Sequence, residues 1–192
     1  MKHTLVALVE NRPGVLNRVV SLFRRRGFNI DSLAVGTTEE EGISRMTIVV
    51  NGDDATIEQV EKQLYKLIDV VQVSDLSQEE TVIRELALVK VHCTPATRHE
   101  VLDLVEIFRA HVIDVSPESL VIQIVAEEDR FEALMENLRP YGVLEMARTG
   151  SIAMLRGSRI TAVHEEAEPE DLQRFHQESG RRPQGELPYV SK

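Results

Sequence analysis

The chain has 192 residues, and 42% of them are hydrophobic, which is enough for one or two small globular domains. Its 32 acidic and 22 basic side chains give a formal net charge of −10. This charge disfavours binding to nucleic acid or to an anionic membrane, because both surfaces are themselves negative. The single cysteine, Cys93, excludes a disulfide or a multi-cysteine metal site within the chain. It suits a reducing compartment, so we expect a cytoplasmic protein.

The first half of the chain predicts strands and helices in the order β-α-β-β-α-β. The expected strands are residues 4–9, 28–35, 43–50 and 70–73. Apolar residues recur every three or four positions in two amphipathic helices, striped by Leu16, Val19, Val20 and Phe23 and by Ile57, Val60, Leu64, Leu67 and Ile68. Gly27 is the expected left-handed cap of the first helix, and Asp53 or Asp54 is the expected N-cap of the second. This order is that of the split βαβ, or ferredoxin-like, unit.

The second half predicts the same order again. Strands are expected at residues 85–93, 112–115 and 120–125, with a last extended run over 143–146 and 152–155. Helical stripes are formed by Val101, Leu104, Val105 and Phe108 and by Phe131, Leu134, Met135 and Leu138. A weak self-match supports a repeat, because Phe23-Arg24 and Ile30-Asp31 align with Phe108-Arg109 and Ile113-Asp114, and Pro13 aligns with Pro95.

The expected domains are therefore residues 1–78 and 79–157, followed by a tail. The predicted fold class is α+β with two ferredoxin-like units. Residues 158–192 contain few apolar residues, and prolines and glycines interrupt them. Such a segment cannot bury enough surface to offset its ordering entropy, so we expect a disordered tail.

The residues suggest no catalytic or metal constellation. There is no glycine-rich phosphate loop and no nucleophile elbow, and no two of the six histidines have helical metal-ligand spacing. The acidic runs 39–41 and 127–129 suit solvated loops and helix starts. The arginines at 24–26 suit the negative end of a helix, with a phosphate or an acidic partner as the alternative.

The most informative segment is the turn Asn11-Arg12-Pro13-Gly14-Val15-Leu16. Gly14 removes a side chain where the first free N–H groups of a helix point outward, which suits a carboxylate. Asn11 can both donate and accept hydrogen bonds, as an amino-acid ligand requires. The alternative is a strand-to-helix turn that uses glycine only for tightness. Spacing alone does not separate the two.

Three segments together resemble one family. They are Val9 to Leu16, Arg26-Gly27-Phe28-Asn29-Ile30-Asp31-Ser32-Leu33 and Ser44-Arg45-Met46-Thr47-Ile48, with a further match at Ala147-Arg148-Thr149-Gly150. The family is the small, regulatory subunit of acetolactate synthase (acetohydroxyacid synthase), and the likeness runs from about Lys2 to Arg156. It implies that the first unit is an ACT domain, an amino-acid-sensing module.

The resemblance also implies a site and an assembly. The family's effector lies between the ACT domains of a homodimer. Carried onto this chain, Asn11, Gly14, Val15 and Leu16 come from one subunit, and Asn29 and Ile30 come from the other. The second unit has Ala96 where the first has Gly14, so we expect no effector there.

The implied role is non-catalytic. Such subunits activate a large catalytic subunit that carries thiamine diphosphate, Mg²⁺ and FAD, and they confer feedback inhibition by branched-chain amino acids, usually valine. No cofactor is expected in this chain, and neither nucleic acid nor a membrane is an expected partner. The alternative is a free-standing ACT-domain sensor that regulates another protein or transcription. The adjoining gene would distinguish these two.

Overall fold

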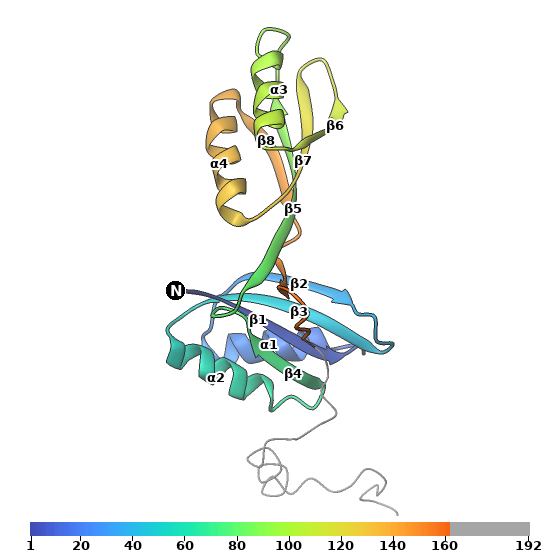
Figure 1. Ribbon diagram of the computed structural model, residues 1–192, viewed down its shortest axis with the longest axis vertical. Helices are drawn as coiled ribbons and strands as arrows, with labels where there is room; N and C mark the ends of the chain where they lie inside the picture. Colours follow the sequence, from blue (N-terminus) through green and yellow to red (C-terminus); the bar gives the residue numbers. More distant parts are fainter. Residues whose placement is uncertain (162–192) are drawn as a thin grey trace, which may run out of the picture. The chain divides into compact units, whose positions relative to one another are not determined.

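A computed structural model describes residues 1–161 of the chain. They form two antiparallel sheets, and two helices cover one face of each sheet (Figure 1). Residues 162–192, which make up most of the predicted tail, lie outside the described residues. No helix within residues 1–161 is long and apolar enough to span a membrane.

The first sheet has the strand order β2-β3-β1-β4. Its elements are β1 Lys2–Glu10, α1 Val15–Arg26, β2 Ile30–Thr37, β3 Ile43–Asn51, α2 Asp54–Leu64 and β4 Val70–Asp75. Both predicted caps are confirmed. Gly27 has a φ of 73°, and the Asp53 side chain accepts a hydrogen bond from the Thr56 N–H at 2.8 Å. The inward faces of β1, β3 and the two helices share one buried core around Leu5, Val19, Phe23, Ile48 and Leu64.

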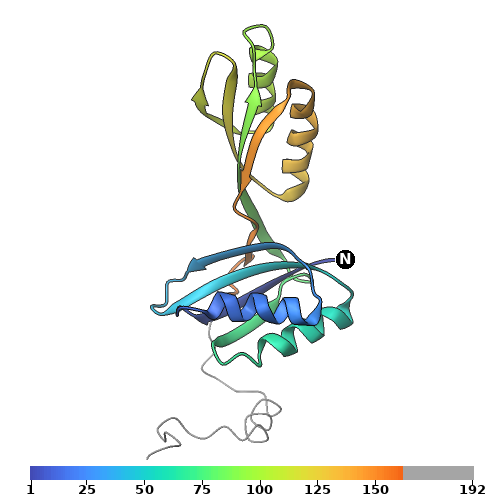
Figure 2. The same cartoon turned by 180° about the vertical axis from the view of Figure 1, so that it is seen from behind.

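The second sheet has the equivalent order β6-β7-β5-β8. Its elements are β5 Thr81–His92, α3 Arg98–Ile107, β6 His111–Val115, β7 Ser119–Ala126, α4 Glu128–Leu138, a 3₁₀ turn Arg139–Tyr141, β8 Val143–Arg148 and β9 Ile152–Leu155. Seen from behind in Figure 2, α3 and α4 cover one face of this sheet as α1 and α2 cover the first. The predicted fold class, α+β with two ferredoxin-like units, is confirmed.

The repeat is present, but the predicted alignment within it is wrong. The Phe23 carbonyl accepts the N–H of Phe28, and the equivalent bond joins the Val105 carbonyl to the N–H of Ala110. Val105 therefore corresponds to Phe23, and Phe108 does not. The turn after α3 places Arg109 at a φ of 51°, where the turn after α1 has Gly27. The two Phe-Arg pairs therefore occupy different positions in the two units.

The strand predicted over 85–93 begins earlier than expected, at Thr81. Residues Thr81–Arg84 pair with β9, while Ala87–Val91 pair with β8. The predicted last extended run is therefore two separate strands that share β5 as their neighbour. This pairing joins residues about seventy positions apart, so no local pattern of hydrophobicity could reveal it.

Strand β9 packs against the face of the first sheet that the helices leave uncovered. Val6, Leu76 and Ala153 are buried together there, with Ile83 and Leu155 against them. The Arg45 guanidinium donates to the Ala153 carbonyl at 2.7 Å. Burial of this guanidinium lowers the pKa of Arg45, and the negative charge of Glu39 offsets part of that shift. The first sheet is thus buried on both faces in this region.

Candidate functional site

The turn from β1 to α1 requires glycine for its backbone. Gly14 is the N-cap of α1 with a φ of 87° and offers no side-chain cap. A Cβ at this position would lie 3.3 Å from Nη1 of Arg18. The turn is tightened by hydrogen bonds from the Arg12 N–H to the Glu10 carbonyl (2.9 Å) and from the Val15 N–H to the Arg12 carbonyl (3.3 Å). The left-handed φ alone therefore explains the glycine.

The same turn leaves the start of α1 open to an anion. The Arg18 N–H donates to the Gly14 carbonyl at 3.0 Å as the first bond of the helix. The N–H groups of Leu16 and Asn17 precede it and have no acceptor within the helix. No acidic residue lies in the first turn. These N–H groups and the positive end of the helix dipole favour a carboxylate at this point.

The four predicted residues of the turn differ in how far they are exposed. Asn11 and Gly14 are exposed, and 43% of Leu16 is exposed. Val15 is only 2% exposed and packs in the first core. A ligand at this turn could therefore contact the side chains of Asn11 and Leu16, but only the backbone of Val15.

An ion pair that the sequence does not reveal anchors the first turn of α1. Arg18 donates to both carboxylate oxygens of Asp69, at 2.6 Å from Nε and 2.8 Å from Nη2. The Asp69 side chain is 8% exposed, and its carbonyl accepts the N–H of Glu10 at 2.8 Å. The only signal in the sequence is an arginine on the polar face of α1, and nothing local identifies its partner.

The other predicted residues, Asn29 and Ile30, open strand β2. Asn29 is exposed, and its amide donates to Asp31 Oδ1 at 2.9 Å. The Asn51 amide donates to Asp31 Oδ2 at 2.6 Å. Asp31 thus holds the start of β2 to the end of β3, and Ile30 packs beside the first core.

Within one chain, these two groups of residues lie at opposite ends of the first sheet. Ile30 pairs with Val50, which pairs with His3 at the start of β1. At the other end of β2, Thr37 pairs with Ser44, which pairs with Val9, shortly before the Asn11–Leu16 turn. A single chain does not bring Asn29 and Ile30 to that turn.

The equivalent turn in the second unit is closed by its own side chains. The Thr94 N–H donates to the Thr97 hydroxyl at 3.1 Å, and the Thr97 N–H donates to the Thr94 hydroxyl at 3.4 Å. The first turn of α3 carries an acid, Glu100, which accepts a hydrogen bond from the Tyr141 hydroxyl at 3.0 Å. These features disfavour an anion at the start of α3.

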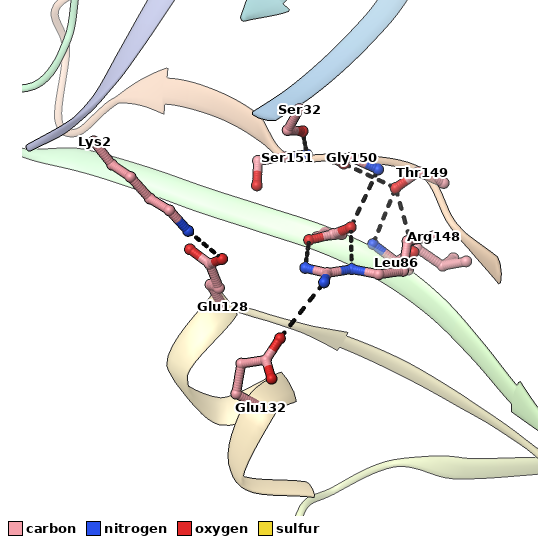
Figure 3. Close-up of polar contacts among 10 residues, drawn as sticks. Lys2, Ser32, Leu86, Glu128, Glu132, Arg148, Thr149, Gly150 and Ser151 are labelled. Atoms are coloured by element: carbon pink, nitrogen blue, oxygen red, sulfur yellow. Dashed lines mark hydrogen bonds and ion pairs between the residues drawn. The ribbon is translucent and has the colours of Figure 1, made fainter. Parts of the chain in front are cut away.

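Residues 148–151 join the second sheet to the edge of the first (Figure 3). Arg148 donates to both oxygens of Glu85, at 2.8 and 2.6 Å, and this bonding raises the pKa of Arg148. Its guanidinium also lies 4.3 Å from the ring centroid of Phe131. The Ser151 N–H donates to the Ser32 hydroxyl at 3.0 Å. In the sequence, this segment stands out only through the family resemblance, and no local pattern indicates its role.

Ser32, Glu85 and residues 148–151 line a cavity of about 630 Å³ whose lining is rich in carboxylates. An ion pair between Lys2 and Glu128 also lies on its wall (Figure 3). Within residues 1–161, no three histidine, cysteine, aspartate or glutamate side chains are grouped to hold a metal ion.

Two family models match the chain. One describes an AHAS small subunit-like ACT domain and matches residues 5–72, and the other describes the small subunit of acetolactate synthase and matches residues 84–157. The probable acetolactate synthase small subunit of Archaeoglobus fulgidus is 55% identical over 159 residues, which is 83% of this chain and 99% of the relative. The acetolactate synthase small subunit of Mycolicibacterium smegmatis is 51% identical over 157 residues, covering 82% and 92%.

A solved structure of the same family is similar to this chain in both sequence and fold. The crystal structure of the acetolactate synthase small subunit from Thermotoga maritima is similar with a TM-score of 0.77 and 46% identity. The match covers 83% of this chain and 99% of that one. Sequence and fold together show that the chain belongs to the family of acetolactate synthase small subunits.

Proposed function

We propose that the chain activates a catalytic acetolactate synthase subunit and makes it sensitive to feedback inhibition by branched-chain amino acids, with valine as the first candidate. The observation that carries the effector part is the open start of α1 at Gly14, in an ACT domain of this family. In this proposal the thiamine diphosphate, Mg²⁺ and FAD of the reaction are held by the catalytic subunit, and this chain has a regulatory role.

The open turn suits the α-carboxylate and ammonium of an amino acid. The N–H groups of Leu16 and Asn17 would bind the carboxylate at the positive end of α1. The Asn11 amide can accept from the ammonium and donate to the carboxylate. Leu16, at 43% exposure, offers an apolar surface for a branched side chain. The site therefore combines the polar and apolar contacts that valine needs.

Two copies are needed to complete this site. Strand β2 is an edge strand, and Val35 on it is 46% exposed. When two copies pair β2 with β2 antiparallel about a two-fold axis, the start of one β2 meets the end of the other. Asn29 and Ile30 of one copy would then approach the Asn11–Leu16 turn of the other. The opposite placement of these groups within one chain supports a homodimer with effectors at the interface between the two β2 strands. We call this interface the effector seam.

Regulation then follows from differential affinity. Valine shifts the dimer only if it binds one arrangement of the paired ACT domains more tightly than the other. The catalytic subunit would be less active with the arrangement that valine favours. The net charge of −10 disfavours nucleic acid and an anionic membrane as partners. We place the subunit in the cytoplasm.

Calorimetric titration of the purified chain with valine, leucine, isoleucine, serine and phenylalanine tests the effector. We expect binding of valine, with weaker binding of leucine or isoleucine and none of serine or phenylalanine. Reconstitution with the catalytic subunit should raise acetolactate formation, and valine should then lower it. Binding of phenylalanine or serine instead, or no rise in activity, would contradict this assignment and favour a free-standing sensor.

A further inference from the structure

We propose that Ser32, Gly150 and Ser151 form a joint that transmits the state of the effector seam to the second ferredoxin-like unit. The joint is the contact between edge strand β2 and the segment that follows β8. This inference rests on the proposed function and names how the site on β2 is coupled to the rest of the subunit.

On the β2 side, the contact is close. The Ser32 hydroxyl accepts the N–H of Ser151 at 3.0 Å (Figure 3). A Cβ at Gly150 would lie 2.8 Å from the Ser32 hydroxyl oxygen and 3.2 Å from the Leu33 carbonyl oxygen. Gly150 also has a φ of 83°. A Cβ here would force a shift of the Ser32 side chain and crowd the Leu33 carbonyl, so the strand and the segment are closely packed.

On the other side, the segment is held by a buried carboxylate. Glu85, whose side chain is 8% exposed, accepts two hydrogen bonds from Arg148 and a third from the Gly150 N–H at 3.2 Å. Since a buried carboxylate that loses these donors would be left unpaired, the segment cannot easily leave Glu85. Gly150 is therefore fixed between β5 and β2.

The joint continues in both directions. Asp31, beside Ser32, binds the Asn29 amide, so two of the predicted effector residues, Asn29 and Ile30, lie at the same end of β2. Beyond Glu85, Arg148 stacks on Phe131, which is buried in the second core. A displacement of β2 at the seam must therefore either break the bond from Ser151 to Ser32 or move the segment against α4.

The Lys2–Glu128 pair is a second link to α4, but its side chains are 49% and 45% exposed. Exposed pairs of this kind contribute little free energy and are screened by salt. The joint is therefore the stronger route for coupling between the seam and α4.

The test compares Ser32→Ala with Ser77→Ala in the full chain. Ser77 is the control, because its hydroxyl also accepts a backbone N–H, that of Thr4 at 3.0 Å, and it lines the same cavity. The hydroxyl of Ser77 donates to Asp75 and not to residues 148–151. We expect Ser32→Ala to leave the valine Kd within about twofold. With the catalytic subunit, it should raise the valine concentration for half-inhibition about tenfold, and Ser77→Ala should change neither.

Hydrogen exchange provides a readout that does not depend on the catalytic subunit. Valine should slow exchange in residues 30–37 and 143–151 of the unsubstituted chain, but only in 30–37 of Ser32→Ala. Unchanged inhibition and unchanged protection of 143–151 in Ser32→Ala would overturn the joint. Gly150→Ala is a second variant and should decouple in the same way, at lower thermal stability.

Valine binding and ligand-free hydrogen exchange distinguish a wrong effector assignment from a wrong joint. If the unsubstituted chain binds no valine, the proposed effector is wrong, but the joint is still tested without ligand. In that case Ser32→Ala should speed exchange in residues 143–151 and Ser77→Ala should not. Equal exchange in the two variants would overturn the joint.

Discussion

Arg18 and Asp69 hold the start of α1 to the loop before β4. Two hydrogen bonds of 2.6 and 2.8 Å join them, and the Asp69 side chain is 8% exposed while that of Arg18 is 46% exposed. Because the Asp69 carbonyl also accepts the Glu10 N–H, one aspartate fixes both α1 and the end of β1. The geometry of the Asn11–Leu16 turn therefore depends on a pair outside the turn.

Arg18→Ala should destabilise the fold by about 1–3 kcal/mol, because it leaves the buried Asp69 carboxylate without its donors. Thermal unfolding at pH 7 measures this. Arg24→Ala is the control, since Arg24 is exposed on the same helix and should change stability by less than about 0.5 kcal/mol. Equal melting temperatures for the two variants would mean that the pair contributes nothing.

Gly14→Asp should abolish valine inhibition with the fold retained. The new carboxylate would occupy the open start of α1 and repel that of valine, so the valine Kd should rise at least about tenfold. Because an aspartate at residue 14 would have to adopt the left-handed φ of 87°, the free energy of unfolding should fall by about 1 kcal/mol. Calorimetry with valine and thermal unfolding measure the two effects.

Two controls separate the site from backbone strain. Gly157→Asp has a similar φ of 80° with open space around it, and Ala96→Asp occupies the equivalent turn of the second unit. Both should bind valine as the unsubstituted chain does. If Gly14→Asp also binds valine normally, the Asn11–Leu16 turn is only a turn.

Val35→Lys should convert a dimer into a monomer. Val35 is 46% exposed on edge strand β2, and a lysine there blocks pairing of two sheet edges. Sedimentation would give the mass. Val115→Lys is the matched control on the edge strand of the second sheet, where Val115 is 59% exposed. Loss of the dimer with Val115→Lys alone would move the interface to β6.

Glu61→Gln should raise stability at pH 7. Burial, with the nearby charge of Asp75, raises the pKa of Glu61 above its ordinary 4.5. The folded state therefore binds this proton more tightly than the unfolded state. The group favours folding below about pH 4.5 and loses that contribution as pH rises through its folded pKa. Glutamine avoids the charged form, and partial exposure limits the gain to less than about 1 kcal/mol.

Melting temperatures at pH 7 and pH 4 check this sign. The advantage of Glu61→Gln should disappear at pH 4. Glu58→Gln, on the same helix, should behave oppositely, because the hydrogen bond from Lys62 lowers the pKa of Glu58. Its replacement should lower stability at pH 7. A variant Glu61→Gln that is less stable than the unsubstituted chain at pH 7 would contradict the assigned cause.

The sequence by itself determined the order of helices and strands as far as β8, the fold class, the cap at Gly27, and a cap at Asp53 or Asp54. It also indicated the Asn11–Leu16 turn. These features depend on residues within a few positions of one another, because apolar periodicity and capping are local. The start of β5 was predicted wrongly because it is set by pairing with β9, about seventy residues away. The error at Phe108 has another cause, because the hydrogen bond from the Ala110 N–H to the Val105 carbonyl sets the register at that helix end.

Only the tertiary structure decided what surrounds the turn and what lies on the far end of β2. The partner of Arg18, the contact of Gly150 with Ser32, and the cover that β9 provides for the first sheet all join residues distant in sequence. The opposite placement of Asn11 and Asn29 likewise follows from strand register. Such relationships depend on how the whole chain packs, because a side chain's partner is set by strand pairing and core packing and not by its neighbours in sequence.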